Sequence, residues 1–271
     1  MATRYWVGGT GTWNSSSTAN WSASSGGAAG ASAPVAADTV IFDSASGTGT
    51  CTTASGATCA IATLNSATLG LILGANLTMT GTFTLTLGAL SLGSSTLSCN
   101  VFSTNNSNTR SIAFGTGGIT LTGSNTTIWV QSTATGFTYT GTPTVNSTYS
   151  GATGTRTITT GGTAGGSATT ALNFAFSAGT DTVSVGGGGH VNNLNFTGFA
   201  GTLSAGARTI YGDLTISSGM TLTAGTQVTT FAATSGTKTI TTAGKTIDNP
   251  ITFNGIGGAW SFADALTQGS T

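Results

Sequence analysis

The sequence predicts an all-β protein, folded as a Gly- and Thr-rich β-solenoid with an N-terminal aromatic cap. Apolar residues alternate with Thr, as in LTMTGTFTLTLGALSLG from residue 77, and this period of two places one set on a single face of a strand. Gly and Ser-Gly turns separate these short runs. No window carries an apolar stripe at the helical period, and Thr, Ser, Gly and Val are poor helix formers.

The composition favours a solenoid over its main alternative, a Gly-rich β-sandwich. The 271 residues include 43 Gly but only 12 Phe and 5 Trp. A sandwich fills two inner faces with interdigitating side chains on longer strands. The coils of a solenoid stack on one another around a narrow interior, which small and aliphatic residues can fill.

Four segments follow one another along the chain. Residues 1–45 are predicted to form a Trp-rich cap or attachment segment, and residues 46–160 a first β-repeat region. Residues 161–190, which include GGTAGG and SVGGGGH, are predicted to be a Gly-rich loop or a domain boundary. Residues 191–271 repeat the alternating pattern as a second β-repeat region, which is expected to continue or to be capped by another subunit.

Three tryptophans, Trp6, Trp13 and Trp21, are concentrated in the first segment. The first coil of a solenoid exposes an unpaired edge and an open apolar interior, which promote aggregation unless they are covered. These side chains are therefore predicted to fold over that end. The alternative is that they face a partner subunit, because Trp is enriched at interface hot spots.

Charge is scarce, with 4% charged residues and a formal net charge of zero. Without a basic stripe, nucleic-acid binding is not expected. The start MATRYWVGG lacks a basic region followed by an apolar run, so it does not resemble a secretory signal. No stretch approaches the roughly 18 apolar residues of a membrane span, so membrane insertion is not expected either.

The sequence offers no arrangement of residues that indicates catalysis, so the chain is expected not to be an enzyme. The six acidic residues are all Asp, and only Asp38 and Asp43 lie close together, at a spacing expected to point them to opposite faces of a strand. Each Asp is predicted to cap a turn. His190 follows four glycines and is predicted to be an exposed loop residue.

The three cysteines do not indicate a metal site. Cys51 and Cys59 bracket a plausible hairpin, and Cys99 follows 40 residues later. Reduced, buried thiols are favoured over a bridge between Cys51 and Cys59. The spacing does not suit zinc, and His190 is the only histidine. No catalytic residue, cofactor or metal ligand is predicted.

Two stretches resemble known proteins. The order of Trp6, Trp13 and the Asn20-Trp21 pair, followed by GGAAGASAPVAADTVIFD, resembles the start of β-helical adhesin-like proteins and phage virion proteins. The ending TKTITTAGKTIDNPITFNGIGGAWSFADALT is similar to repeats of phage structural proteins. This resemblance implies a β-solenoid presented on a particle, other virion proteins as partners and, by analogy with fibrous viral proteins, a homotrimer.

Two function classes follow. The first is a non-enzymatic structural or adhesive component of a phage particle, located in the virion, such as a tail fibre, a spike or a capsid-surface fibre or decoration. The second is a bacterial surface adhesin or carbohydrate-binding module. In the second class Trp129, Tyr139 and Tyr149 are the candidates for stacking on sugars, and a host-surface glycan is the expected ligand.

Overall fold

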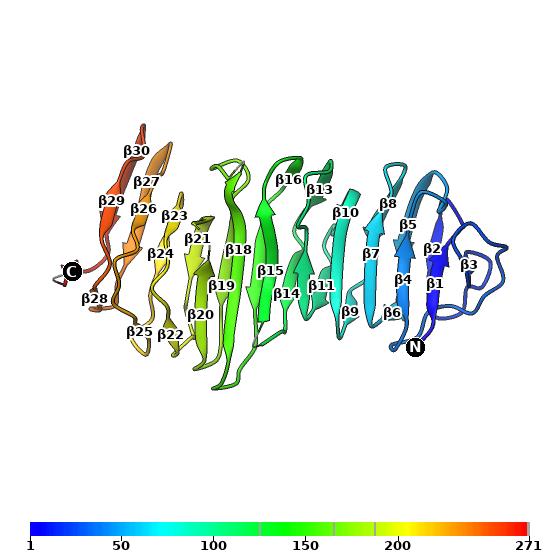
Figure 1. The fold of residues 1–271 in the computed structure, drawn as a ribbon, viewed down its shortest axis with the longest axis horizontal. Helices are drawn as coiled ribbons and strands as arrows, with labels where there is room; N and C mark the ends of the chain where they lie inside the picture. The colour runs from blue at the N-terminus through cyan, green and yellow to red at the C-terminus, as the bar shows by residue number, and fades with distance from the viewer. Residues whose placement is uncertain (125, 165, 187, 270–271) are drawn as a thin grey trace. The chain divides into compact units, whose positions relative to one another are not determined.

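The computed structural model describes residues 1–124, 126–164, 166–186 and 188–269, and over these residues the protein is all-β. It divides into two compact units, residues 1–120 with 136–143 and residues 121–135 with 144–271. Each unit is a β-solenoid in which strands from successive coils pair in parallel (Figure 1). No described residue belongs to a helix able to span a bilayer.

The first unit has three strips of strands. The first strip holds, in spatial order, β3 (Trp21–Ser22), β1 (Thr3–Trp6), β4 (Thr39–Phe42), β7 (Ile61–Asn65), β10 (Thr82–Ser91) and β12 (Val101–Ser103). The second holds β2 (Gly11–Trp13), β5 (Gly49–Thr53), β8 (Leu69–Leu73), β10 again, β13 (Arg110–Ala113) and β16 (Phe137–Thr140). The third holds β6 (Thr58–Cys59), β9 (Leu77–Met79) and β11 (Thr96–Cys99). The chain then passes through β14 (Gly118–Leu121) into the second unit.

The second unit repeats this plan. One strip holds β15 (Thr126–Thr133), β18 (Thr155–Ala164), β20 (Thr182–Gly186), β22 (Thr202–Leu203) and β25 (Thr221–Leu222). Another holds β17 (Thr144–Ser147), β19 (Leu172–Phe176), β21 (Gly189–Asn195), β23 (Arg208–Ile210), β26 (Thr229–Phe231) and β29 (Ile251–Phe253). A branch from β21 holds β24 (Leu214–Thr215), β27 (Gly236–Thr241) and β30 (Gly258–Phe262), and β28 (Thr246–Ile247) pairs with β31 (Thr267–Gln268).

The pairing register places apolar residues beside apolar residues, and threonines beside threonines, in successive coils. Ala62 of β7 lies beside Phe83 of β10, which lies beside Phe102 of β12, and all three side chains are fully buried. Their outward neighbours along the same strands, Thr63 and Thr84, also pair. Because each buried Phe contributes about 1.5–3 kcal/mol relative to exposure, a slip by one residue would turn a whole apolar row toward solvent.

A corner of the coil shows why glycine is required. β10 belongs to two strips, and its register shifts between Leu85 and Leu87. Just beyond this bulge, Gly88 has a φ of +106°, a conformation that residues with a Cβ rarely adopt. A Cβ there would also collide with the carbonyl oxygen of Ser66. Burial alternates along β10 only as far as Leu85, and the next buried residue is Leu90, so the bulge and the glycine let the chain change strips.

The structure corrects the prediction for residues 161–190. Instead of a loop or boundary, this segment contains the end of β18, all of β19 and β20 and the start of β21. Gly186 pairs with Thr159, and Gly189 pairs with Arg208. Gly186 and Gly189 lie in strands because a neighbouring coil pairs with each of them. Gly161, Gly179 and Gly188 keep the positive φ that is typical of turns. Gly165 and Gly187 lie outside the described residues.

Candidate functional site

The three N-terminal tryptophans form a single buried cluster with Phe42. Trp6, Trp13 and Trp21 are all 0% exposed. The ring centroids of Trp6 and Trp21 are 5.1 Å apart at 82°, and those of Trp13 and Trp21 are 5.5 Å apart at 76°. Such edge-to-face pairs bring the positive edge of one ring to the negative face of the next.

This cluster covers the first coil. The short strand β3 pairs antiparallel with β1, with Trp6 opposite Trp21, and so covers the outer edge of β1. Gly11 lies against the ring of Trp6, since a Cβ at this position would come within 3.0 Å of it. The full burial of these three side chains agrees with the cap interpretation and leaves them no exposed surface to present to a partner.

The predicted sugar-stacking residues do not present free rings. Trp129 is 0% exposed, and its Nε1 donates to Oε1 of Gln131 at 3.1 Å, so its prediction as an exposed residue is wrong. The register of β15 shifts between Thr127 and Trp129, and this bulge turns both Ile128 and Trp129 inward. Alternation alone would have placed one of these neighbours outside.

Both tyrosines are half-buried. Tyr139 in β16 packs edge-on against Phe114, with ring centroids 6.3 Å apart. The ring of Tyr149 lies 5.5 Å from the guanidinium carbon of Arg156, and its hydroxyl donates to the carbonyl of Thr153 at 3.2 Å. Each ring is thus engaged with its own chain on at least one side.

Asp38 and Asp43 bind backbone amides of their own turns, as predicted, whereas Asp213 and Asp264 bind amides of a neighbouring coil. The carboxylate of Asp38 accepts hydrogen bonds from the backbone N–H of Ala2 at 2.7 Å and of Val35 at 3.2 Å. Burial alone would raise the pKa of Asp38, but these two donors and the positive charge of Arg4 outweigh burial and lower it. Asp43, Asp213 and Asp264 likewise accept from backbone N–H groups of nearby turns or coils.

Asp181 departs from the turn-capping prediction. Its two carboxylate oxygens accept from Nε of Arg156 at 2.9 Å and from Nη2 at 2.7 Å, and both side chains are 0% exposed. The guanidinium of Arg156 also lies 5.2 Å from the ring of Phe199. This bidentate pair joins β18 to the turn before β20 and is closed to solvent, so its role is structural.

His190 also differs from its prediction. It lies in β21 and is half-buried. Its ring stacks on Tyr211 at 5.8 Å with an interplanar angle of 22°, and Nδ1 is 2.8 Å from the tyrosine hydroxyl. Gly166 packs against the other side of the imidazole, because a Cβ there would come within 2.5 Å of His190 Cδ2. The preceding glycines therefore do not make it a loop residue.

A surface hollow adjoins this stacked pair. It has a volume of ≈ 270 Å³ and is lined by Ala168, Thr169, Asn192, Tyr211, Thr234, Ser235 and Lys238. An aromatic ring beside hydroxyl, amide and ammonium groups can bind a sugar by stacking and hydrogen bonds. Sequence reasoning missed this site because its residues come from four separate segments, and only the stacking of coils brings Tyr211 to His190.

The last coil exposes apolar side chains. Phe253 in β29 is 47% exposed, Phe262 in β30 is 41% exposed, and Ile256 between them is 91% exposed. We call these three residues the C-terminal patch. Trp260 and Phe253 both pack on Phe231, with ring centroids 4.8 and 5.1 Å from it. Among the described residues, β29 and β30 each pair with a strand on one side only.

All three cysteines are buried, and no Cys51–Cys59 bridge is present. Burial raises the pKa of Cys51, and it raises that of Cys99 to about 12. Burial and the negative charge of Asp38 raise the pKa of Cys59 to about 12. Within the described ranges, no group of three or more His, Cys, Asp or Glu residues could hold a metal ion.

Comparison of this chain with protein-family models, with curated proteins and with solved structures finds no match.

Proposed function

We propose that this chain is a non-enzymatic structural and adhesive component of a phage particle, such as a tail fibre, a spike or a capsid-surface fibre. The observation that carries the proposal is a contrast between two coils. The first coil of the first unit is covered by Trp6, Trp13 and Trp21, all fully buried. The last coil of the second unit carries the exposed C-terminal patch beside β29 and β30, each of which pairs on one side only among the residues that the structure describes.

The C-terminal patch fits a β-structured partner. The free edges of β29 and β30 offer backbone N–H and C=O groups to another strand, and such edges bind extended chains by β-augmentation. Phe253 and Phe262 supply the aromatic side chains that dominate the energetics of stable interfaces. Another subunit of the particle would pair with these edges and cover both rings. Homotrimerisation remains a prediction, to be checked by sedimentation equilibrium.

A structural role also agrees with the hydrogen bonds and the ion pair that the carboxylates form within the chain. Asp38, Asp43, Asp213 and Asp264 accept hydrogen bonds from backbone amides, and Asp181 is held in an ion pair closed to solvent. Groups held in this way fix turns and connect coils. Glycoside cleavage instead uses two carboxylates facing one bond of a substrate.

The deciding experiment is mass spectrometry of purified particles, combined with immunogold imaging of the same particles. We expect the chain at a fixed stoichiometry in particles that survive washing, with label on a fibre, spike or capsid surface. Recovery of the chain only in a bacterial cell envelope, with none in particles, would overturn the proposal.

A second candidate is a bacterial surface adhesin or carbohydrate-binding module, and the hollow beside Tyr211 favours it. This hollow combines a half-buried aromatic ring with Asn192, Thr169 and Lys238. Glycan-array screening of the intact chain tests it. Binding at this hollow by a chain found in the cell envelope would support the second candidate, and the absence of any glycan ligand would contradict it.

A further inference from the structure

Three arginines are buried in the part of the chain that the structure describes, and they differ in how their positive charges are compensated. Arg156 pairs with the carboxylate of Asp181. Arg110 donates to both the carbonyl and the hydroxyl oxygen of Thr104, among other partners. Arg208, in β23, is 6% exposed and forms no ion pair with any described residue.

The guanidinium of Arg208 is only partly hydrogen-bonded. Its Nε donates to the carbonyl of Gly206 at 3.1 Å, and its Nη2 donates to the carbonyl of Ser204 at 2.7 Å. Nη1 donates to none of the described residues. Burial lowers the pKa of Arg208 to about 10, so the group still carries its positive charge at neutral pH. Burying a cation without a counter-charge costs free energy that two neutral carbonyls only partly offset.

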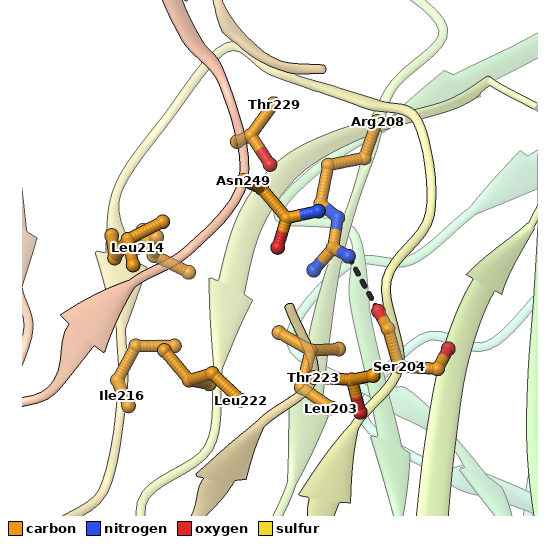
Figure 2. A pocket seen from close by; sticks show the side chains of 10 residues that line it. Leu203, Ser204, Arg208, Leu214, Ile216, Leu222, Thr223, Thr229 and Asn249 are labelled. Atoms are coloured by element: carbon orange, nitrogen blue, oxygen red, sulfur yellow. Dashed lines mark hydrogen bonds between the residues drawn. The ribbon is translucent and has the colours of Figure 1, made fainter. Parts of the chain in front are cut away.

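A cavity adjoins this uncompensated charge. It has a volume of ≈ 30 Å³, counted as positions open to the centre of a water molecule, and no aspartate lines it. Figure 2 shows the Arg208 guanidinium pointing into the space that Leu222, Thr223 and Asn249 also border.

The cavity opens to solvent on one side, because Thr223, which borders it, is exposed. Ser204 contributes its backbone carbonyl, which accepts from Nη2 of Arg208, while its side chain points away from the guanidinium (Figure 2). The site thus combines one cationic donor, apolar walls and an entrance.

We propose that this cavity binds a small monovalent anion of the size of chloride. An anion there would accept from Nη1 of Arg208 and would neutralise the buried charge. The Coulomb attraction is strengthened because Leu203, Leu214 and Ile216 line the cavity with apolar groups. The space is sufficient for one chloride or bromide ion, whose single charge matches that of the guanidinium.

The direct test is diffraction from crystals of the whole chain soaked in sodium bromide. We expect an anomalous peak at hydrogen-bonding distance from Nη1 of Arg208. A cavity that holds only water, or is empty, after a bromide soak would overturn the proposal. This measurement needs no variant, so it does not depend on whether a substituted chain folds.

A solution test compares chloride with gluconate, which is too large for the cavity, at equal ionic strength. We expect the thermal midpoint to rise by about 2–4 °C when chloride exceeds its dissociation constant about fivefold, because a ligand that binds only the folded state stabilises it. Arg208→Met should abolish this difference. Lys245→Met, which removes the same charge away from the cavity, should leave it unchanged. An equal response of the wild-type chain and Arg208→Met would contradict the proposal, as would the absence of any chloride effect.

Discussion

Arg156 and Asp181 form a bidentate ion pair from which solvent is excluded, with 2.9 Å between Nε and Oδ2 and 2.7 Å between Nη2 and Oδ1. The pair joins residues of neighbouring coils. Its geometry satisfies both charges, but removing either partner would leave the other buried and uncompensated. It is therefore a sensitive point for the stability of the second unit.

Asp181→Asn is expected to lower the free energy of unfolding by about 3–5 kcal/mol, because the Arg156 charge would lose its counter-charge in an apolar setting. Asp213→Asn is the matched control, since it removes the same charge from a more exposed carboxylate in the same unit. Urea titration measures both. The double variant Arg156→Met with Asp181→Leu should recover much of the loss. Equal stability of the two single variants would contradict this account.

Trp13→Ala is expected to destabilise the first unit by about 3–5 kcal/mol and to promote aggregation, because it opens a cavity in the cap. The control is Val35→Ala, at a side chain 58% exposed, where a change within about 0.5 kcal/mol is expected. Thermal unfolding and light scattering give the two readouts. A soluble Trp13→Ala chain of unchanged stability would mean that the cluster does not seal the coil.

Substitution by Phe should cost different amounts of stability at Trp6 and at Trp13. Nε1 of Trp6 donates to the carbonyl of Gly9 at 2.9 Å, whereas Nε1 of Trp13 is buried without a partner. Trp6→Phe therefore loses a hydrogen bond that Trp13→Phe does not, and it should cost about 1 kcal/mol more. The denaturant midpoints of the two variants measure this difference, provided that the free energy of unfolding has the same dependence on denaturant concentration in both. Equal costs for the two substitutions would count against the hydrogen bond.

Cys59 should make stability fall at high pH. Its thiol pKa rises from 9.0 to about 12 in the folded chain, so between these values the unfolded chain releases a proton that the folded chain keeps. The contribution is fully present below pH 9 and is lost as the pH approaches 12, at about 1.4 kcal/mol per pH unit. Cys59→Ala should lose less stability over this range than the wild-type chain. Parallel pH profiles of the two chains would refute the assignment.

The C-terminal patch should control assembly. Replacing Phe253 and Phe262 with Ser is expected to lower incorporation into particles about tenfold or more, because exposed aromatics that become buried at an interface dominate its energetics. Val35→Ser is the control, since it removes an exposed apolar side chain from the other unit. Quantitative mass spectrometry of particles measures incorporation. Unchanged incorporation of the double variant would rule out the patch as the attachment surface.

Glycan binding, if detected, should depend on Tyr211. Tyr211→Ala is expected to weaken it about five- to tenfold through loss of the aromatic face. Tyr211→Phe keeps that face and should bind nearly as well, although it loses the contact with His190. Tyr139→Ala, in the other unit, is the control. Glycan affinity measured by calorimetry should then rank Tyr211→Ala last, and equal affinities of the two Ala variants would place the glycan elsewhere.

Local pattern was sufficient for the all-β class and the stacked coils. Alternation of apolar residues with Thr specifies which face of each strand is inside, and this requires only neighbouring residues. Asp38 and Asp43 were also predictable as turn residues, because a short carboxylate reaches nearby amides.

Other features depended on which coil stacks on which. The bulge at Trp129 turned a predicted surface ring inward, and pairing with Arg208 held Gly189 in an extended strand. The contact of His190 with Tyr211 and the uncompensated charge of Arg208 join residues distant in sequence. A period of two encodes the face of a residue but not its neighbour in the next coil. The lengths of the intervening turns and the positions of bulges determine that neighbour. The free energies of these turns and bulges depend on how the coils pack together.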